Sequence, residues 1–231
     1  MTSASDASRR NLLTALLSFN GGFVDTAGFL GLAGLFTAHV TGNFVTLAAA
    51  LVTGSHGIIG KLIALPEFVL VVALARLAGG ALRARHMAVQ RPLLGAKVVL
   101  LAAFFVLAVR YGPFPDVDAP VALLTGFCAI AAMAIQNAVQ RVPLSALPPT
   151  TLMTGSTTQV VLDSVDLLTG IGATPQTRER ARKLTLAILC FAAGCATAAL
   201  LYWLVGFWCL ALPVVVGAAT VVLRIEPAPP T

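Results

Sequence analysis

Thr41-Gly42-Asn43 lies inside a long apolar run, and a related step, Thr154-Gly155-Ser156, occurs in the second half of the chain. Each step opens a short apolar segment that ends on a Thr-Gly pair, first at Thr53-Gly54 and then at Thr169-Gly170. As α-helices at about 1.5 Å per residue, these segments would be ~18 and ~22 Å long. A full crossing needs ~20 apolar residues, so both are interpreted as half-helices. Interrupted segments at matching positions of two halves are typical of a transporter site at the membrane midplane.

Composition indicates a membrane protein with several crossings. Of the 231 residues, 58% are hydrophobic and 10% are charged, and the mean hydropathy is +0.92. A soluble domain of this size could not bury so much apolar surface. The net charge of +6 does not indicate nucleic-acid binding, because basic residues beside membrane helices are ordinary determinants of topology. Residues 1–231 are therefore expected to form one domain within the lipid bilayer.

Eight apolar stretches alternate with short polar segments. They cover residues 12–36, 43–53, 58–82, 93–111, 119–140, 156–169, 184–203 and 205–223. If all eight crossed the membrane, with Arg9 and Arg10 inside, the basic 83–91 loop would lie outside and break the positive-inside rule. If the half-helices are re-entrant, the 83–91 loop and the basic 178–183 cluster lie inside and the acidic 112–118 loop lies outside. Charge bias therefore favours six crossings plus two re-entrant half-helices.

An odd number of crossings in each half inverts one half relative to the other. Residues 10–112 and 118–224 each contain three crossing helices and one half-helix, so the predicted fold is an all-α polytopic membrane protein built from two inverted repeats. Both termini are expected to be cytoplasmic. Inverted repeats bring the N-terminal ends of the half-helices together near the membrane centre. The extended backbone before each half-helix needs protein or a polar cavity around it.

The two helix starts are the predicted solute site. Gly42 and Gly155 would let the backbone turn tightly just before each half-helix. Residues suited to helix N-caps flank both glycines: Thr41, Asn43, Thr154 and Ser156. Free N–H groups and the positive end of the helix dipole favour an anion or a carbonyl-type oxygen there. The alternative is a structural cap on a kinked helix, but the repetition of the step favours a binding site.

Polar residues inside the long apolar stretches supply further candidates. A carboxylate at mid-membrane costs at least ~2.5–3.5 kcal/mol on insertion scales, so Asp25 should face a cavity or a partner. It is either a proton-coupling group or a structural hydrogen-bond acceptor, and His39 could pair with it as the second coupling candidate. Gln136 and Asn137 stand at the corresponding place in the second half and are assigned to the solute site. Lys97, near the start of its apolar stretch, is interpreted as an interface anchor.

The sequence indicates no other chemistry. It contains no nucleophile–base pair and no nucleotide motif, so neither an enzyme nor a bound cofactor is expected. The cysteines lie in apolar runs without metal-ligand spacing, and no metal site is expected. The small-residue patterns Ala27-xxx-Gly31 and Ala75-xxx-Gly79 allow close helix packing or a homodimer.

Four motifs in a fixed order carry a resemblance to a known family. They are Gly22-Phe-Val-Asp25-Thr-Ala-Gly28, His39-Val-Thr-Gly-Asn43, Ile135-Gln-Asn-Ala138 and Met153-Thr-Gly-Ser-Thr157. With them the chain resembles, over nearly its whole length, the YoaK-like bacterial inner-membrane proteins, a family of unknown function. The resemblance implies a multi-pass protein of the bacterial inner membrane and supplies no substrate.

The sequence thus favours a small secondary transporter for an anionic or polar solute, with proton coupling as the expected use of Asp25. A passive channel with the same central constriction is the alternative. A flux that saturates and follows a pH gradient would distinguish the carrier from the channel. A membrane scaffold without transport is a third hypothesis, and it would show no central polar cavity.

Overall fold

The computed structural model describes residues 4–223, and these residues form helices joined by turns, without a strand among them. The elements in chain order are α1 (Ala4–Gly31), α2 (Gly42–Thr53), α3 (Ile58–Ala84), α4 (Gln90–Tyr111), α5 (Pro120–Arg141), α6 (Met153–Thr169), α7 (Pro175–Val205), the 3₁₀ helix η1 (Gly206–Leu210) and α8 (Ala211–Val222). The expected all-α fold is confirmed. Arg224, which the sequence analysis placed in the second repeat, and the tail after it lie outside the described residues.

Four helical segments in the described part of the chain are long and apolar enough to cross a membrane. They are α3, α4, α5 and the segment Pro175–Val222, which contains α7, η1 and α8. Large apolar side chains such as Leu74, Leu189 and Trp203 are exposed on these segments. Such exposure fits helices whose outer surface meets lipid rather than water. The structure therefore has the helices of a membrane protein.

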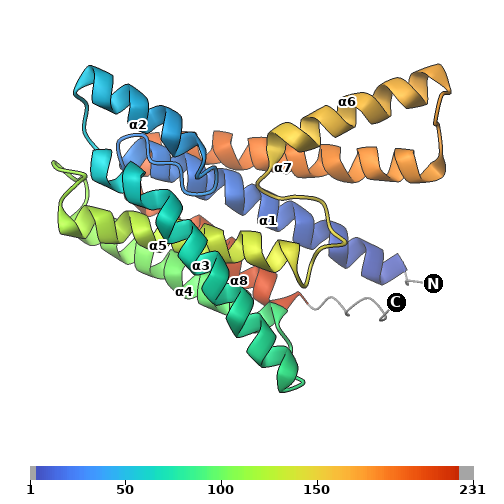
Figure 1. The fold of residues 1–231 in the computed structure, drawn as a ribbon, viewed down its shortest axis with the longest axis horizontal. Coiled ribbons are helices and arrows are strands. Elements are labelled where there is room, and N and C mark those ends of the chain that lie inside the picture. The colour runs from blue at the N-terminus through green and yellow to red at the C-terminus, as the bar shows by residue number, and fades with distance from the viewer. Residues whose placement is uncertain (1–3, 224–231) are drawn as a thin grey trace.

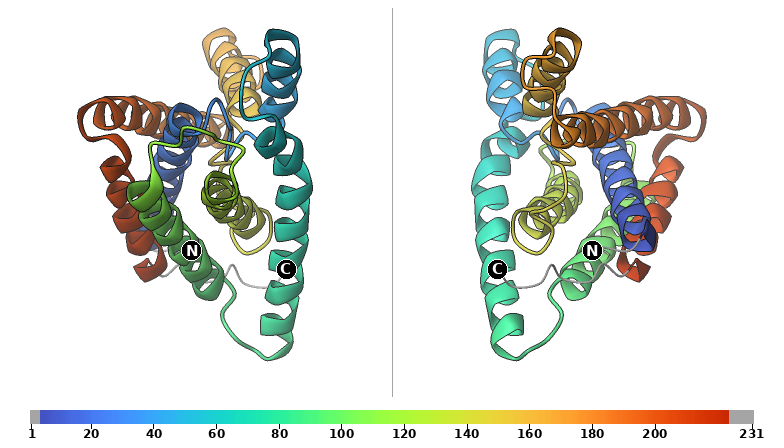
Figure 2. Two further views of the ribbon diagram at one scale, coloured as in Figure 1. Left: turned by 90° about the vertical axis from the view of Figure 1, so that its left-hand side faces the viewer. Right: turned by 90° about the vertical axis from the view of Figure 1, so that its right-hand side faces the viewer.

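The chain bends at η1, so α7 and α8 are two separate helices with different directions. Gly206 ends α7 with φ 57° and ψ −140°, a conformation that glycine adopts without steric cost. α8 then leaves α7 in a different direction, as the end views in Figure 2 show. The sequence-based division between apolar stretches 184–203 and 205–223 thus coincides with a real turn.

The two short helices occupy one face of the molecule. α2 and α6 begin near its middle and run toward opposite ends (Figure 1). The end views place them next to each other on the same face (Figure 2). The α2–α3 and α4–α5 turns lie at one end of the long axis, whereas the start of α1 and the α6–α7 turn lie at the other (Figure 1).

Helix contacts follow a regular scheme. α1 packs extensively on α7, and α5 packs on α4 and α3. α2 lies along α3, α6 lies along α7, and α8 contacts both α4 and α1. Gly22 and Gly194 permit the closest of these approaches, because a Cβ at either position would collide with a backbone carbonyl of the facing helix. Small residues commonly let the backbones of membrane helices approach in this way.

Both small-residue patterns proposed for a dimer are used inside the chain. A Cβ added at Gly31 would collide with the ring of Phe207, and one at Gly79 would lie 3.2 Å from Cγ1 of Val89. Ala27 and Ala75 are also buried. The patterns therefore serve close helix packing within the chain, and a homodimer stays a prediction.

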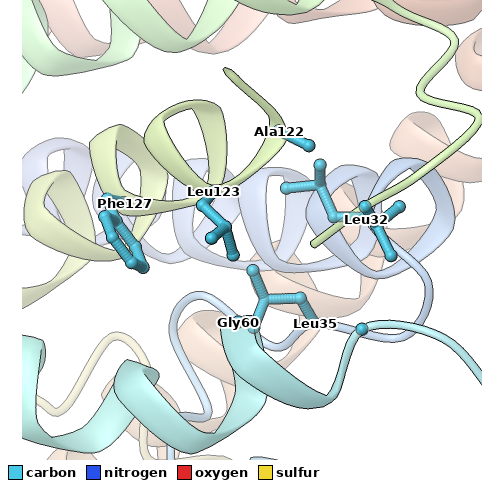
Figure 3. A pocket seen from close by; sticks show the side chains of 8 residues that line it. Leu32, Leu35, Gly60, Ala122, Leu123 and Phe127 are labelled. Carbon is cyan, nitrogen blue, oxygen red and sulfur yellow. The ribbon is translucent and has the colours of Figure 1, made fainter. Parts of the chain in front are cut away.

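Asp118, in the α4–α5 turn, fixes the start of α3. Its two carboxylate oxygens accept the backbone N–H groups of Gly57, Ile58, Ile59 and Gly60 at 3.1–3.3 Å. These are the N–H groups that have no partner within a helix. A small hollow next to this contact lies between α1, α3 and α5, and its walls are apolar, with Leu32, Gly60 and Phe127 among them (Figure 3). The hollow thus offers nothing to a polar solute.

Candidate functional site

Asp25 of α1 holds the segment that precedes α2. Its Oδ1 accepts the backbone N–H groups of Thr37 and Ala38, each at 2.7 Å. Its Oδ2 lies 2.6 Å from Nδ1 of His39. Asp25 is 5% exposed, so these contacts satisfy a carboxylate and two amides that are out of reach of water. The structure thus brings Asp25 and His39 together and makes Asp25 an anchor of this segment, while a coupling role for the pair stays a prediction.

Asn43 does not act as the expected N-cap of α2. Its Oδ1 accepts the N–H of Phe36 at 2.9 Å, and its Nδ2 donates to the carbonyl of Phe36 at 2.8 Å. Because both ends of the amide are engaged by the backbone of one residue, Phe36, neither is left for the helix start. α2 begins at Gly42 without a side-chain cap from Thr41. Asn43 and Asp25 therefore both shape the turn that leads into α2.

α5 holds the segment before α6 by similar means. Oε1 of Gln140 accepts the N–H of Thr150 at 2.9 Å and its hydroxyl at 2.6 Å, while Nε2 donates to the carbonyl of Pro148. One turn earlier, Oδ1 of Asn137 accepts the hydroxyl of Thr151 at 2.8 Å. Here amides replace the carboxylate, so the second segment is held without a charge.

Gln136 connects this segment to two other helices. Its Nε2 donates to Oγ1 of Thr150 at 3.0 Å and to the carbonyl of Leu17 on α1 at 2.9 Å. Its Oε1 accepts Nζ of Lys97 on α4 at 2.6 Å. Gln136 and Lys97 are both 0% exposed. Gln136 is therefore a structural junction between helices in this structure, and its predicted role in solute binding stays a prediction.

The interpretation of Lys97 as an interface anchor is wrong. Its ammonium group points into the bundle because its partner, Gln136, is buried in α5. A lysine near the end of an apolar stretch normally extends to the interface. The position of Lys97 in the sequence alone therefore did not predict its burial. The sequence did contain one indication of this contact: Lys97 lies in one apolar stretch, and Gln136, a polar residue that needs a partner, lies in another.

The two segments meet α1 within about one helical turn. Asp25 holds the first segment, and Gly21 faces the second. A Cβ added at Gly21 would lie 3.2 Å from the carbonyl oxygen of Thr150 and 3.5 Å from Nε2 of Gln136. The chains leading into α2 and α6 therefore approach the same part of α1.

The glycines at the two steps do not have the predicted backbone. Neither Gly42 nor Gly155 has a positive φ, and α6 begins at Met153, so Gly155 already lies in its first turn. Ser156 does not cap the helix, because its hydroxyl donates to the carbonyl of Leu152 at 2.9 Å, a common use of a serine within a helix. Thr154 makes no side-chain cap either. Asp25 and Gln140 bind the backbone at bends further back in each segment, at residues 37–38 and 150.

A polar pocket opens beside the second segment. It is lined by Asn137, Gln140, Arg141, Ser145, Leu147, Pro149, Thr151 and Leu152. Among the predicted solute residues, Asn137 lines it, and the residues of the two Thr-Gly steps do not. Arg141 was not a candidate in the sequence analysis, because an arginine at a helix end indicates topology before it indicates binding. Amide groups and a guanidinium together suit an anionic or polar solute.

Comparison with known proteins identifies the family. The chain matches, over residues 13–223, the family described as "Protein of unknown function (DUF1275)". It belongs to the DUF1275 family. No curated protein and no solved structure matches the chain.

The DUF1275 match covers every residue of the site just described. It confirms the expectation of an uncharacterised family and assigns no substrate or activity to this member. Within residues 4–223, no group of histidine, cysteine and acidic side chains is arranged to hold a metal ion.

Proposed function

We propose that this DUF1275 protein is a small secondary transporter for an anionic or polar solute. One observation carries the proposal: two non-helical segments, each followed by a short helix, are held against α1 at Gly21 and Asp25. Irregular backbone at membrane depth is stable only where protein or a polar cavity satisfies it. In secondary transporters such interrupted segments form the solute and ion sites.

Two inverted repeats are part of this proposal, and the packing of the helices supports them. α1 packs on α7 as α5 packs on α3, and α2 lies along α3 as α6 lies along α7. α4 contacts α5 as α8 contacts α1. The opposite directions of α2 and α6 (Figure 1) fit half-helices that enter the membrane from opposite sides. With the basic 178–183 cluster in the cytoplasm, both termini of this inner-membrane protein would be cytoplasmic.

The pocket next to the second segment supports the solute class. Arg141 supplies a fixed positive charge and can hold a carboxylate or oxyanion with two parallel hydrogen bonds. The amides of Asn137 and Gln140 can donate to further oxygens. Proton coupling through Asp25 and His39, which are in contact at 2.6 Å, belongs to the same proposal.

Flux measurements on purified protein in liposomes test this function. The test solutes are formate, acetate, nitrate and phosphate, each presented with and without an imposed pH gradient. We expect protein-dependent uptake of at least one anion that saturates with concentration and is lost in Arg141→Gln. Arg110→Gln is the matched control, because Arg110 is exposed near the end of α4 and does not line the pocket.

Two results would contradict a carrier. A flux that rises linearly with concentration would indicate the channel alternative. Absence of flux for all four anions, together with a Ser145→Cys thiol that water-soluble reagents do not reach, would indicate a scaffold without a solute pathway.

A further inference from the structure

Lys97 is a charged residue at a depth where charges are costly. It lies in α4, one of the segments able to cross a membrane, and it is 0% exposed. An ammonium group has three N–H donors, but the hydrogen bond that Lys97 makes in the described structure goes to Oε1 of Gln136. It forms no ion pair with any described residue. Ionisable residues inside membrane segments are rare and usually functional.

The helices around Lys97 supply no acid to balance its charge. α4 packs on α5, α8 and η1. The ionisable residues of α5 are Cys128 and Arg141, η1 has Cys209, and α8 has none. α4 itself also carries Arg91, Arg110 and Tyr111. On α1, which Gln136 also contacts, Asp25 is already engaged by the segment before α2. Charge on Lys97 is therefore stabilised by the dipole of Gln136 and by no neighbouring carboxylate.

A continuous series of hydrogen bonds leads from Lys97 to the polar pocket. Nζ of Lys97 donates to Gln136 at 2.6 Å, Gln136 donates to Oγ1 of Thr150 at 3.0 Å, and that hydroxyl lies 2.6 Å from Oε1 of Gln140. Gln140 lines the pocket. We call these four residues the Lys97 relay.

The strength of the bonds in the Lys97 relay depends on the charge of Lys97. A charged ammonium group can only donate, so it fixes Oε1 of Gln136 toward α4 and Nε2 toward Thr150. The Thr150 hydroxyl then accepts from Gln136 and donates to Gln140. A neutral amine can accept as well as donate, and its bond to Gln136 is weaker because it is no longer charge-assisted. The carbonyl of Leu17 and the N–H of Thr150 keep the two amides oriented in either state. Loss of the proton therefore weakens the first bond of the series and the polarisation that it gives to the following bonds.

Lys97 can lose and regain a proton without breaking the fold. A neutral lysine keeps two N–H groups and still reaches Gln136, and burial then leaves no uncompensated charge. From these observations we infer that Lys97 is a proton-exchange site of the transporter and that the Lys97 relay passes its charge state to the solute pocket. The inference rests on the proposed transport function and adds a coupling group in α4, in the first half of the chain, that is linked to the pocket in the second half.

Thiol accessibility in the pocket tests the inference without a solute. In a background in which Cys128, Cys190, Cys195 and Cys209 are replaced by alanine, Ser145→Cys places a thiol at the exposed rim of the pocket. Its labelling rate with a water-soluble methanethiosulfonate is measured from mildly acidic to mildly alkaline pH. Ser55→Cys, exposed in the α2–α3 turn, is labelled in parallel to correct for the pH dependence of thiol reactivity itself.

We expect the corrected labelling rate at Ser145→Cys to change by about fivefold or more between the acidic and alkaline ends of this pH range. A fivefold effect is at the lower end of what coupling between two sites usually produces. Lys97→Met should abolish the change, because methionine has no proton to exchange. Lys97→Arg should hold the acidic value at every pH, since arginine stays charged. Glu67→Gln is the matched control: Glu67 is an ionisable residue within α3 that is not part of the relay, and its replacement should leave the pH response intact.

The results separate the relay from the transport proposal. A pH response that persists in both Lys97→Met and Lys97→Arg, or that is absent before any lysine substitution, overturns the inference even if anion transport is found. If Lys97→Met does not fold, Lys97→Arg still decides the question, because it retains the charge and the hydrogen-bond donor. A pH response that depends on Lys97 upholds the relay, and absence of flux in the liposome assay would then count against transport alone.

Discussion

Asp163 of α6 and Arg180 of α7 are joined by two hydrogen bonds. Oδ2 of Asp163 accepts Nε of Arg180 at 2.9 Å, and Oδ1 accepts Nη2 at 2.6 Å. The side chain of Asp163 is fully buried, whereas that of Arg180 is 54% exposed. Gln159, one turn earlier in α6, donates to the same Oδ1 at 2.8 Å. α2 carries no charged residue, so it is held to α3 without such a bridge.

Removal of the Asp163 charge should loosen α6. Asp163→Asn keeps the shape of the side chain but replaces one charge-assisted acceptor by a donor that faces the guanidinium. We expect the free energy of unfolding to fall by about 1.5–3 kcal/mol, the usual range for hydrogen bonds to charged groups, measured as a lower Tm in detergent. Asp166→Asn is the control, because Asp166 lies on the same helix and is only partly buried. An equal effect of both substitutions would show that overall charge, and not the bridge, is responsible.

Alanine should not be tolerated at Gly22 or Gly194. The added Cβ would collide with the backbone carbonyl of Phe191 or of Phe19, and a backbone cannot move aside as a flexible side chain can. Overpacking of this kind costs about 1–3 kcal/mol, so each variant should have a lower Tm. At Gly80 and Gly95 no atom lies within 4 Å of an added Cβ. Alanine in these helices should therefore be neutral or stabilise by up to ~1 kcal/mol.

Two substitutions at Asp25 separate anchoring from proton coupling. Asp25→Leu leaves the N–H groups of Thr37 and Ala38 without an acceptor. At about 1–3 kcal/mol for each buried donor, it should sharply reduce the amount of folded protein in the membrane. Asp25→Asn keeps Oδ1 as an acceptor and removes the titration, so we expect normal membrane levels and loss of proton-driven uptake. Unchanged proton-driven uptake in Asp25→Asn would leave Asp25 with its anchoring role alone.

The proposed topology can be tested by labelling engineered thiols in whole cells. Ala88→Cys lies in the exposed α3–α4 turn, and Pro115→Cys lies in the exposed α4–α5 turn. In a background without native cysteines, an impermeant reagent should label Pro115→Cys from outside and Ala88→Cys only after the membrane is permeabilised, because the basic turn is expected inside. Labelling of Ala88→Cys from outside would contradict the six-crossing topology.

Hydropathy, together with the glycines that end apolar stretches, predicts most helix limits. The stretch predicted at 43–53 is α2 (Gly42–Thr53), and it stops where Gly54 adopts a left-handed φ of 66°. The start predicted for the next stretch, at residue 58, is also correct. α7 begins nine residues earlier than the apolar stretch at 184, at Pro175, because charged residues with good helix propensity continue the helix beyond the membrane. Hydropathy marks the part of a helix that meets lipid, not the whole helix.

Side-chain partners in the site were beyond the reach of sequence patterns. The hydrogen bond between Lys97 and Gln136 joins residues 39 apart in the chain, and no local period encodes which faces of α4 and α5 will meet. Asp25 and His39 are close in sequence, and their pairing could be anticipated. The predicted N-cap roles of Asn43 and Ser156 were wrong. Asn43 binds the backbone N–H and carbonyl of Phe36, and Ser156 donates to the carbonyl of Leu152.

The contact between Asp118 and the start of α3 has a consequence for biosynthesis. Asp118 and Gly57 are 61 residues apart, so the ribosome adds the whole of α3 and α4 between them. Until the α4–α5 turn is complete, the first N–H groups of α3 have no carboxylate to bind and must be solvated by water or lipid headgroups. When α4 has been inserted, the start of α3 therefore still lacks its acceptor. The contact can form only after translation has passed α4 and reached Asp118.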